Sequence, residues 1–183
     1  MVSAVFFLSE FCLLQGTIIT FTYDTKIPKE ESSIHKGKVI KIAFNWNGTR
    51  MVTADDAGLI AIWKGMSCLC SYQREGAITH CLFADLVMED PQQKQKSKMN
   101  NLLFFGGTAG IVWLGDDANH CTELCKIVGT IKSLLFYERD NSIILITNTL
   151  LLVTFKITTG QKSSPDKRVK LSIAGDPEKL TSL

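Results

Sequence analysis

The sequence has almost no net charge and no long hydrophobic run. Its 183 residues carry 20 Lys and Arg against 18 Asp and Glu, which leaves a formal charge of +2. Because charges of both signs are mixed along the chain, charge provides no footprint for a nucleic acid or an acidic membrane. No window approaches the run of about 18 apolar residues that marks a membrane-spanning helix. The sequence therefore predicts no nucleic-acid partner and no transmembrane segment.

The sequence also lacks the residue patterns of an enzyme. It has no paired catalytic carboxylates, no nucleophile elbow and no histidine with a catalytic partner at a recognisable spacing. The stretch Gly106–Gly110 is rich in glycine, but no helix or lysine follows it, so a hairpin turn explains it better than a phosphate-binding loop. We predict no enzymatic activity, no catalytic residue and no cofactor.

The cysteines do not follow the spacing of a common zinc site. They are Cys12, Cys68, Cys70, Cys81, Cys121 and Cys125. Cys68 and Cys70 would share one face of a strand, whereas zinc knuckles use Cys-x-x-Cys turns. We predict buried free thiols in a reducing compartment and no metal. The alternative is a zinc-binding β-protein that uses the set His80, Cys81, His120, Cys121 and Cys125.

The first fifteen residues are apolar but do not form a typical signal peptide. They have no basic start, carry Glu10 inside the apolar run and offer no small-x-small cleavage site. We therefore expect the chain in the cytoplasm.

What the sequence does contain is a series of short strands and tight turns between residues 35 and 75. Three apolar runs, at 39–44, 51–54 and 59–63, are separated by the turns Asn45–Thr49 and Asp55–Gly58. Gly48 suits a positive backbone angle in the first turn, and Gly58 closes the second turn. A less apolar fourth strand fits 68–72, as expected for the outermost strand of a sheet. The segment predicts one four-stranded blade and an all-β fold, which needs neighbouring blades for stability.

Weaker copies of the same pattern flank this blade. We predict an incomplete blade at 1–34, full blades at 35–75, 76–128 and 129–175, and a tail at 176–183. The second full blade contains a polar insertion at 84–101, where Lys94, Lys96 and Lys98 form a candidate partner- or anion-binding loop. A solvated insertion without function is the alternative that the composition favours. The total is about three and a half blades, whereas closed propellers have about four to eight.

The best blade resembles the WD40 family of β-propellers. In that family a histidine, a serine or threonine, an aspartate and a tryptophan form an internal hydrogen-bond network. His35, Thr53, either Asp55 or Asp56, and Trp63 match those places. The usual Trp-Asp pair is here Trp63-Lys64, so the copy is divergent. The resemblance implies a partial WD40-type β-propeller whose matched residues are structural.

A narrower resemblance joins the weaker blades in their order. The segments 78–83, 103–113 and 131–138, with the insertion between the first two, resemble the amino-terminal propeller of the intraflagellar transport protein 140 family. That family implies a scaffold of intraflagellar transport complex A, working in retrograde transport, cilium assembly and ciliary membrane-protein trafficking. It also implies complex A subunits and ciliary cargo proteins as partners, and a place at the cilium and ciliary base.

This chain departs from that family by having neither a second propeller nor helical repeats. We therefore expect a fragment, a short isoform or an incomplete gene model. The alternative function is a generic cytosolic WD40 adaptor for protein interactions outside cilia.

Overall fold

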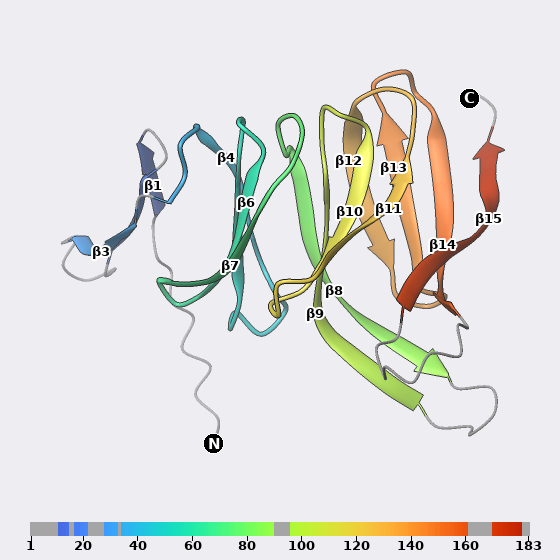
Figure 1. Cartoon of the computed structure of the whole chain (residues 1–183), viewed down its shortest axis with the longest axis horizontal. Helices are drawn as coiled ribbons and strands as arrows, with labels where there is room; N and C mark the ends of the chain where they lie inside the picture. Colours follow the sequence, from blue (N-terminus) through green and yellow to red (C-terminus); the bar gives the residue numbers. More distant parts are fainter. Residues whose placement is uncertain are drawn as a thin grey trace.

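The computed structural model describes residues 11–14, 17–21, 28–32, 34–89, 96–160 and 170–180, and the side chains of 34–86 and 99–157. All the secondary structure in these ranges is β-strand, arranged in four antiparallel sheets that follow one another along the chain (Figure 1). The described residues contain no helix that is long and apolar enough to cross a membrane.

The sheets are simple meanders, because each strand pairs with its neighbours in the chain. The first sheet contains β1 (Phe11–Leu14), β2 (Thr17–Phe21) and β3 (Pro28–Ser32), and the second contains β4 (Val39–Phe44), β5 (Met51–Asp55), β6 (Leu59–Lys64) and β7 (Ser67–Gln73). The third contains β8 (His80–Glu89), β9 (Lys96–Gly106), β10 (Ile111–Gly115) and β11 (Cys121–Lys126), and the fourth contains β12 (Ile131–Tyr137), β13 (Ser142–Thr147), β14 (Leu152–Gly160) and β15 (Lys170–Leu180).

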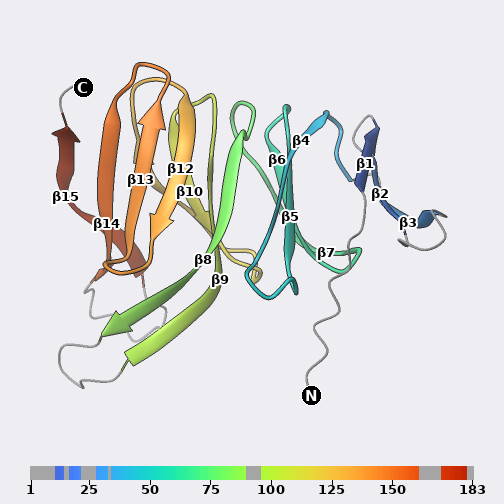
Figure 2. The same cartoon turned by 180° about the vertical axis from the view of Figure 1, so that it is seen from behind.

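The second, third and fourth sheets pack face to face like the blades of a propeller. Their first strands, β4, β8 and β12, contact one another along the inner side and come to the front in Figure 2. The outer strands are the least buried, as β7 and β11 show by their mostly exposed or half-buried residues. This gradient from inside to outside is the one expected for blades around an axis.

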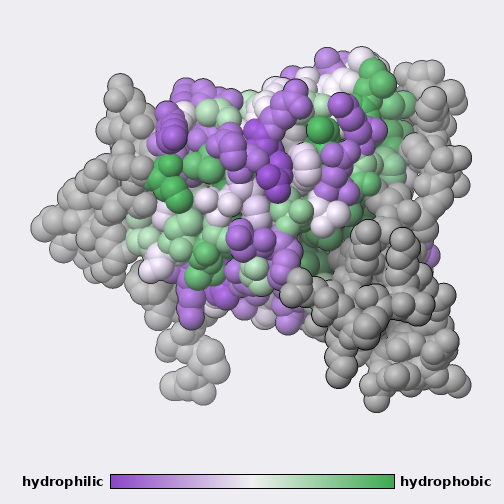
Figure 3. All heavy atoms as spheres, viewed as in Figure 1, coloured by the Kyte–Doolittle hydropathy of each residue, from purple (hydrophilic) through white to green (hydrophobic). Residues whose placement is uncertain are grey.

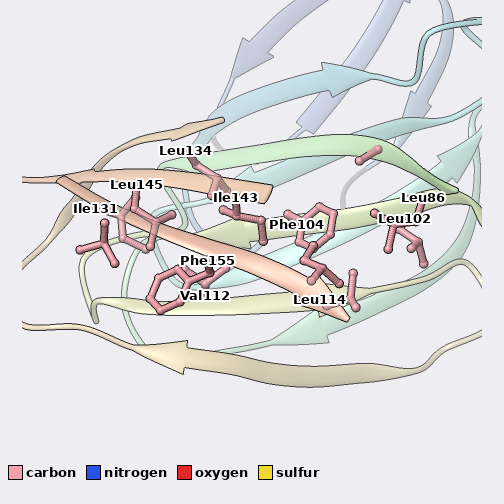
Figure 4. Packing of buried hydrophobic residues seen from close by; sticks show 13 residues of the cluster. Leu86, Leu102, Phe104, Val112, Leu114, Ile131, Leu134, Ile143, Leu145 and Phe155 are labelled. Carbon is pink, nitrogen blue, oxygen red and sulfur yellow. The ribbon is translucent and has the colours of Figure 1, made fainter. Parts of the chain in front are cut away.

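Apolar side chains fill the spaces between the second and third sheets and between the third and fourth sheets. Between the third and fourth sheets, Phe104 and Val112 face Ile143, Leu145 and other aliphatic residues (Figure 4). The Phe104 and Phe136 rings stack with centroids 5.7 Å apart. A second cluster joins the second and third sheets. Since burial of apolar area is the main stabilising force in folding, each sheet depends on its neighbour.

The polar insertion predicted at 84–101 proves to be mostly strand. β8 and β9 continue past the blade as a two-stranded ribbon, paired from Leu86↔Met99 to Glu89↔Lys96 after a register shift beyond Ala84. Leu86 is fully buried at the base of the ribbon, which fixes where it leaves the blade. A polar composition suggested a loop, but pairing of the two backbones satisfies their hydrogen bonds without apolar side chains.

The other limits of the predicted blades remain predictions, with one visible difference. The predicted tail at 176–183 continues as strand to Leu180, which pairs with Leu152 on β14. Residues 1–10 of the predicted incomplete blade lie outside the described residues, and β1, β2 and β3 account for the described rest of that segment.

Candidate interaction surface

A buried hydrogen-bond network joins two strands of the second sheet, β5 and β6, to the segment before the sheet. His35 bonds through Nδ1 to Asp55 Oδ2 at 3.0 Å and through Nε2 to Thr53 Oγ1 at 2.6 Å. The indole Nε1 of Trp63 donates to the same Thr53 hydroxyl at 2.8 Å. All four side chains are buried, so unpaired polar atoms here would be costly. Asp55, and not Asp56, is therefore the aspartate of the network.

Asp56 instead bonds to the backbone at the start of its blade, and equivalent contacts occur in the next two blades. Its Oδ1 accepts from the backbone N–H of Lys38 at 2.8 Å, and its own N–H donates to the Lys38 carbonyl at 3.0 Å. The same reciprocal pair joins Thr108 to Ala77 and Asn148 to Thr130. A polar side chain in the turn between the second and third strands thus ties each turn to the start of its own blade.

This repeated contact explains why a glycine starts each blade. A Cβ on Gly129 would lie 2.6 Å from Asn148 Oδ1, and one on Gly76 would lie 2.5 Å from Thr108 Oγ1. A Cβ on Gly37 would likewise lie too close to Asp56 Oδ1. A side chain at these positions would collide with the group that ties the turn. This contact between the turn and the start of the blade was not predicted from the sequence. The signal that could have indicated it is a glycine about twenty to thirty residues before each polar turn residue.

The same three turns end in a left-handed residue. Gly58 and Gly110 have φ angles of 88° and 71°, and Leu150 occupies the matching place in the fourth sheet with a φ of 59°. In each turn the backbone N–H of this residue donates to the carbonyl three residues earlier. The left-handed conformation of Leu150 is one that favours glycine. Because the leucine side chain is 79% exposed, little packing compensates for the cost of this conformation.

The opposite end of the sheets carries the loop between β4 and β5. Every polar group of Asn45 is bonded within or next to this loop: its N–H to the Arg50 carbonyl, its carbonyl to the Gly48 N–H, and its side-chain oxygen to the Arg50 N–H. Its side-chain nitrogen donates to Thr49 at 3.1 Å and to Asn101 Oδ1 at 2.7 Å. Trp46 follows Asn45 and is 82% exposed. The loop is thus held firmly while its indole points to solvent.

Polar contacts at this end connect the second sheet to the third. Arg50 Nε donates to Asp117 Oδ2 at 2.9 Å, and Asn101, which receives the Asn45 bond, lies on β9 at the base of the ribbon. The Tyr72 hydroxyl donates to the Asp116 carbonyl at 2.5 Å. Burial raises the pKa of Tyr72, so the hydroxyl remains a proton donor. These contacts fix the loops of two blades relative to each other.

Comparison with known proteins decides the family. The model of the family described as the IFT140 first beta-propeller matches residues 86–181, more than half of the 183 residues. The chain belongs to this family. No curated protein matches the chain.

Solved structures show the same fold at low sequence identity. A chain of the mitotic checkpoint complex matches with a TM-score of 0.61 at 15% identity, over 82% of this chain and 46% of that one. The computationally designed Ika8 protein matches with a TM-score of 0.62 at 17% identity, over 85% and 45%. The chain thus spans less than half the length of each. The fold is all-β, a partial WD40-type β-propeller with one three-stranded and three four-stranded sheets among the described residues.

The described part of this IFT140-family chain does not bring the residues of the zinc alternative together. Among the described side chains, no group of three or more His, Cys, Asp or Glu could hold a metal ion. Burial raises the pKa of Cys81 and of Cys125 to about 12. Within the set proposed for zinc, the His120 ring instead bonds to Asp116 Oδ2 at 2.9 Å. The zinc alternative thus finds no support in the described part of the chain.

The lysines of the predicted loop are not gathered into a described site. Lys96 and Lys98 lie on β9 in the ribbon, opposite Glu89 and Val87 on β8. Lys94 lies outside the described residues. Their part in binding a partner or an anion stays a prediction.

The described face of the IFT140-family chain seen in Figure 3 is chemically mixed. Hydrophilic and hydrophobic residues alternate over its centre. Specific partner binding on such a surface depends on a few anchoring side chains.

Proposed function

We propose that this chain is a non-enzymatic scaffold segment of the kind found in intraflagellar transport complex A. The match of the IFT140 first beta-propeller family over residues 86–181 carries the proposal. The buried polar groups of the described blades add support, because they are used in structural bonds: the His35 network holds a blade together, and Asn45 holds a loop.

The finer parts of the proposal follow from the family. The chain would bind other complex A subunits and ciliary cargo proteins through propeller loops. It would act in retrograde intraflagellar transport, cilium assembly and trafficking of ciliary membrane proteins. Its place would be the cilium and ciliary base as well as the cytoplasm.

Affinity purification from ciliated cells tests this function. The tagged chain is expressed in these cells, and the proteins that co-purify are quantified by mass spectrometry. An unrelated propeller segment of the same length with the same tag is the control. We expect complex A subunits to be enriched with the chain and absent from the control.

A different outcome would favour the alternative function. If the chain purifies in folded form, without complex A subunits and with a reproducible set of non-ciliary proteins, it is a general WD40 adaptor. Fluorescence imaging of the same tagged chain separates the two further, because only the ciliary scaffold concentrates at the ciliary base.

A further inference from the structure

We propose that Trp46 is the anchor of a protein-binding surface at the end of the blades that carries the β8–β9 ribbon. This inference rests on the proposed scaffold function and deepens it, because it names the surface through which complex A would be bound. The turns with Gly58, Gly110 and Leu150 lie at the opposite end.

Trp46 differs from the other two tryptophans of the chain. Trp63 is buried and donates its indole N–H to Thr53. Trp113 is half-buried and lies under the guanidinium of Arg74, 4.7 Å from its ring centroid. The indole of Trp46 is 82% exposed and has no hydrogen bond or ring contact to any described residue. A large aromatic surface in water gains much free energy when a partner covers it.

The loop that carries Trp46 is rigid before any partner binds. The bonds of Asn45 close the loop from both sides, and Asn47 Oδ1 accepts from the Thr49 N–H at 3.1 Å and from its hydroxyl at 2.6 Å. The exposure of the indole therefore does not result from a loosely held loop. Because the backbone is already ordered, a partner would not have to order it, and this makes a large aromatic residue an effective anchor.

The loop also lies at the junction of two blades. Asn101, with its left-handed φ of 58°, receives the bond from Asn45 and is itself tied by its N–H to Asp85 Oδ1 at 3.0 Å. Arg50 of the loop reaches Asp117 between β10 and β11. The loop of the second blade that carries Trp46 is thus bonded to residues of the third blade, so one partner could contact both blades.

The surroundings of Trp46 indicate the chemistry of the partner. The buried indole N–H would need an acceptor, so the partner should offer an apolar pocket edged by a carbonyl or side-chain oxygen. Asn47, Gly48 and Thr49 beside Trp46 are polar, which does not favour insertion into lipid. The arginine of the loop is already paired with Asp117, so the loop itself offers no unpaired cation to a phosphate backbone. A protein is therefore the partner that fits.

Photo-crosslinking locates the surface directly. A photoreactive phenylalanine analogue replaces Trp46 in the 183-residue chain expressed in ciliated cells, and the crosslinked protein is identified by mass spectrometry. The same analogue at Val128, also 82% exposed but near the glycine turns, is the matched control. We expect a crosslink to a complex A subunit from position 46 and none from position 128.

Affinity measurements with purified complex A provide the second readout. Trp46→Ala should weaken binding about 30-fold, the usual effect at an anchoring residue. Trp46→Phe should keep part of the affinity, and Val128→Ala should keep all of it. Unchanged urea midpoints would show that the variants fold alike.

The outcomes separate this inference from the proposed function. If complex A co-purifies equally with the native chain and with Trp46→Ala, the function stands and the Trp46 surface is wrong. If complex A does not bind the native chain, the function itself fails. Trp46-dependent binding to vesicles of phosphatidylcholine and phosphatidylserine, or to a single-stranded oligonucleotide, without binding to complex A would also overturn the inference.

Discussion

Replacing Leu150 by glycine should stabilise this protein, although it removes an apolar side chain. Leu150 has a φ of 59°, and a residue with a Cβ in the left-handed region costs about 1 to 2 kcal/mol relative to glycine. Glycine also makes the unfolded chain more flexible, and this stabilises the unfolded state and reduces the gain by about 0.4 to 1 kcal/mol. Since Leu150 is 79% exposed, almost no burial is lost. The net gain should be about 0.5 to 1 kcal/mol.

The measurements are urea unfolding and thermal unfolding, both followed by circular dichroism and tryptophan fluorescence. For a chain of this size the melting temperature should rise by about 2 °C. Leu150→Ala is the matched control, because it removes the same side chain but keeps the Cβ and its strain, and it should leave stability nearly unchanged. Gly110→Ala should do the reverse of Leu150→Gly and cost about 2 kcal/mol or more. Its Cβ would meet the carbonyl oxygens of Ile127 and Gly129 at 2.5 Å.

The reasoning would be refuted by a loss of stability in Leu150→Gly. Such a loss would mean that the leucine side chain packs in solution or that the turn does not hold a left-handed residue. An equal gain from Leu150→Ala would locate the effect in the exposed side chain and not in the backbone.

Three further predictions concern the buried Trp63, the half-buried His80 and the pair of cysteines Cys68 and Cys81. Trp63→Ala should destabilise the fold by on the order of 3 kcal/mol, measured by urea unfolding, because the indole is 1% exposed and bonded to Thr53; a loss of less than half of this would place the ring outside the core. Burial lowers the pKa of His80 from 6.5, so the unfolded state binds more protons and stability should fall as the pH drops below about 6.5. His80→Gln should flatten this part of the stability curve, and an unchanged slope would contradict the assignment. Exposed Cys68 should react with iodoacetamide well before Cys81, whose pKa burial raises to about 12; peptide mapping showing equal rates would contradict the packing.

The sequence was most informative where local chemistry and tertiary packing agree. The strands predicted at 39–44, 51–54, 59–63 and 68–72 correspond to β4, β5, β6 and β7. Short apolar runs between turns rich in Gly, Asn and Asp leave little choice but a meander. The family resemblance stated from the order of the weaker blades is confirmed by the match over residues 86–181.

The sequence was less informative where the structure depends on backbone pairing or on hydrogen bonds between residues far apart in the chain. The polar composition of the β8–β9 ribbon predicts a loop, whereas the two backbones pair, and this pairing needs no apolar side chains. The turn at Leu150 lacks the glycine that marks its two relatives, so its left-handed backbone has no local signal. The loop of Trp46 was recognised as a turn, but its hold on the next blade through Asn45 and Asn101 depends on residues far apart in the chain.

The sequence alone determined that this protein is a series of β-blades, because strand length, alternation and turn residues are local properties. Only the tertiary structure decided which of two adjacent aspartates joins the His35 network. Asp55 ends β5 with its side chain in the blade, whereas Asp56 turns outward to hold the Lys38 backbone. The tertiary structure also decided that Trp63 is buried and Trp46 is exposed. The side chains are chemically identical, and what separates them is where the backbone places each: one inside a sheet, the other at the tip of a loop.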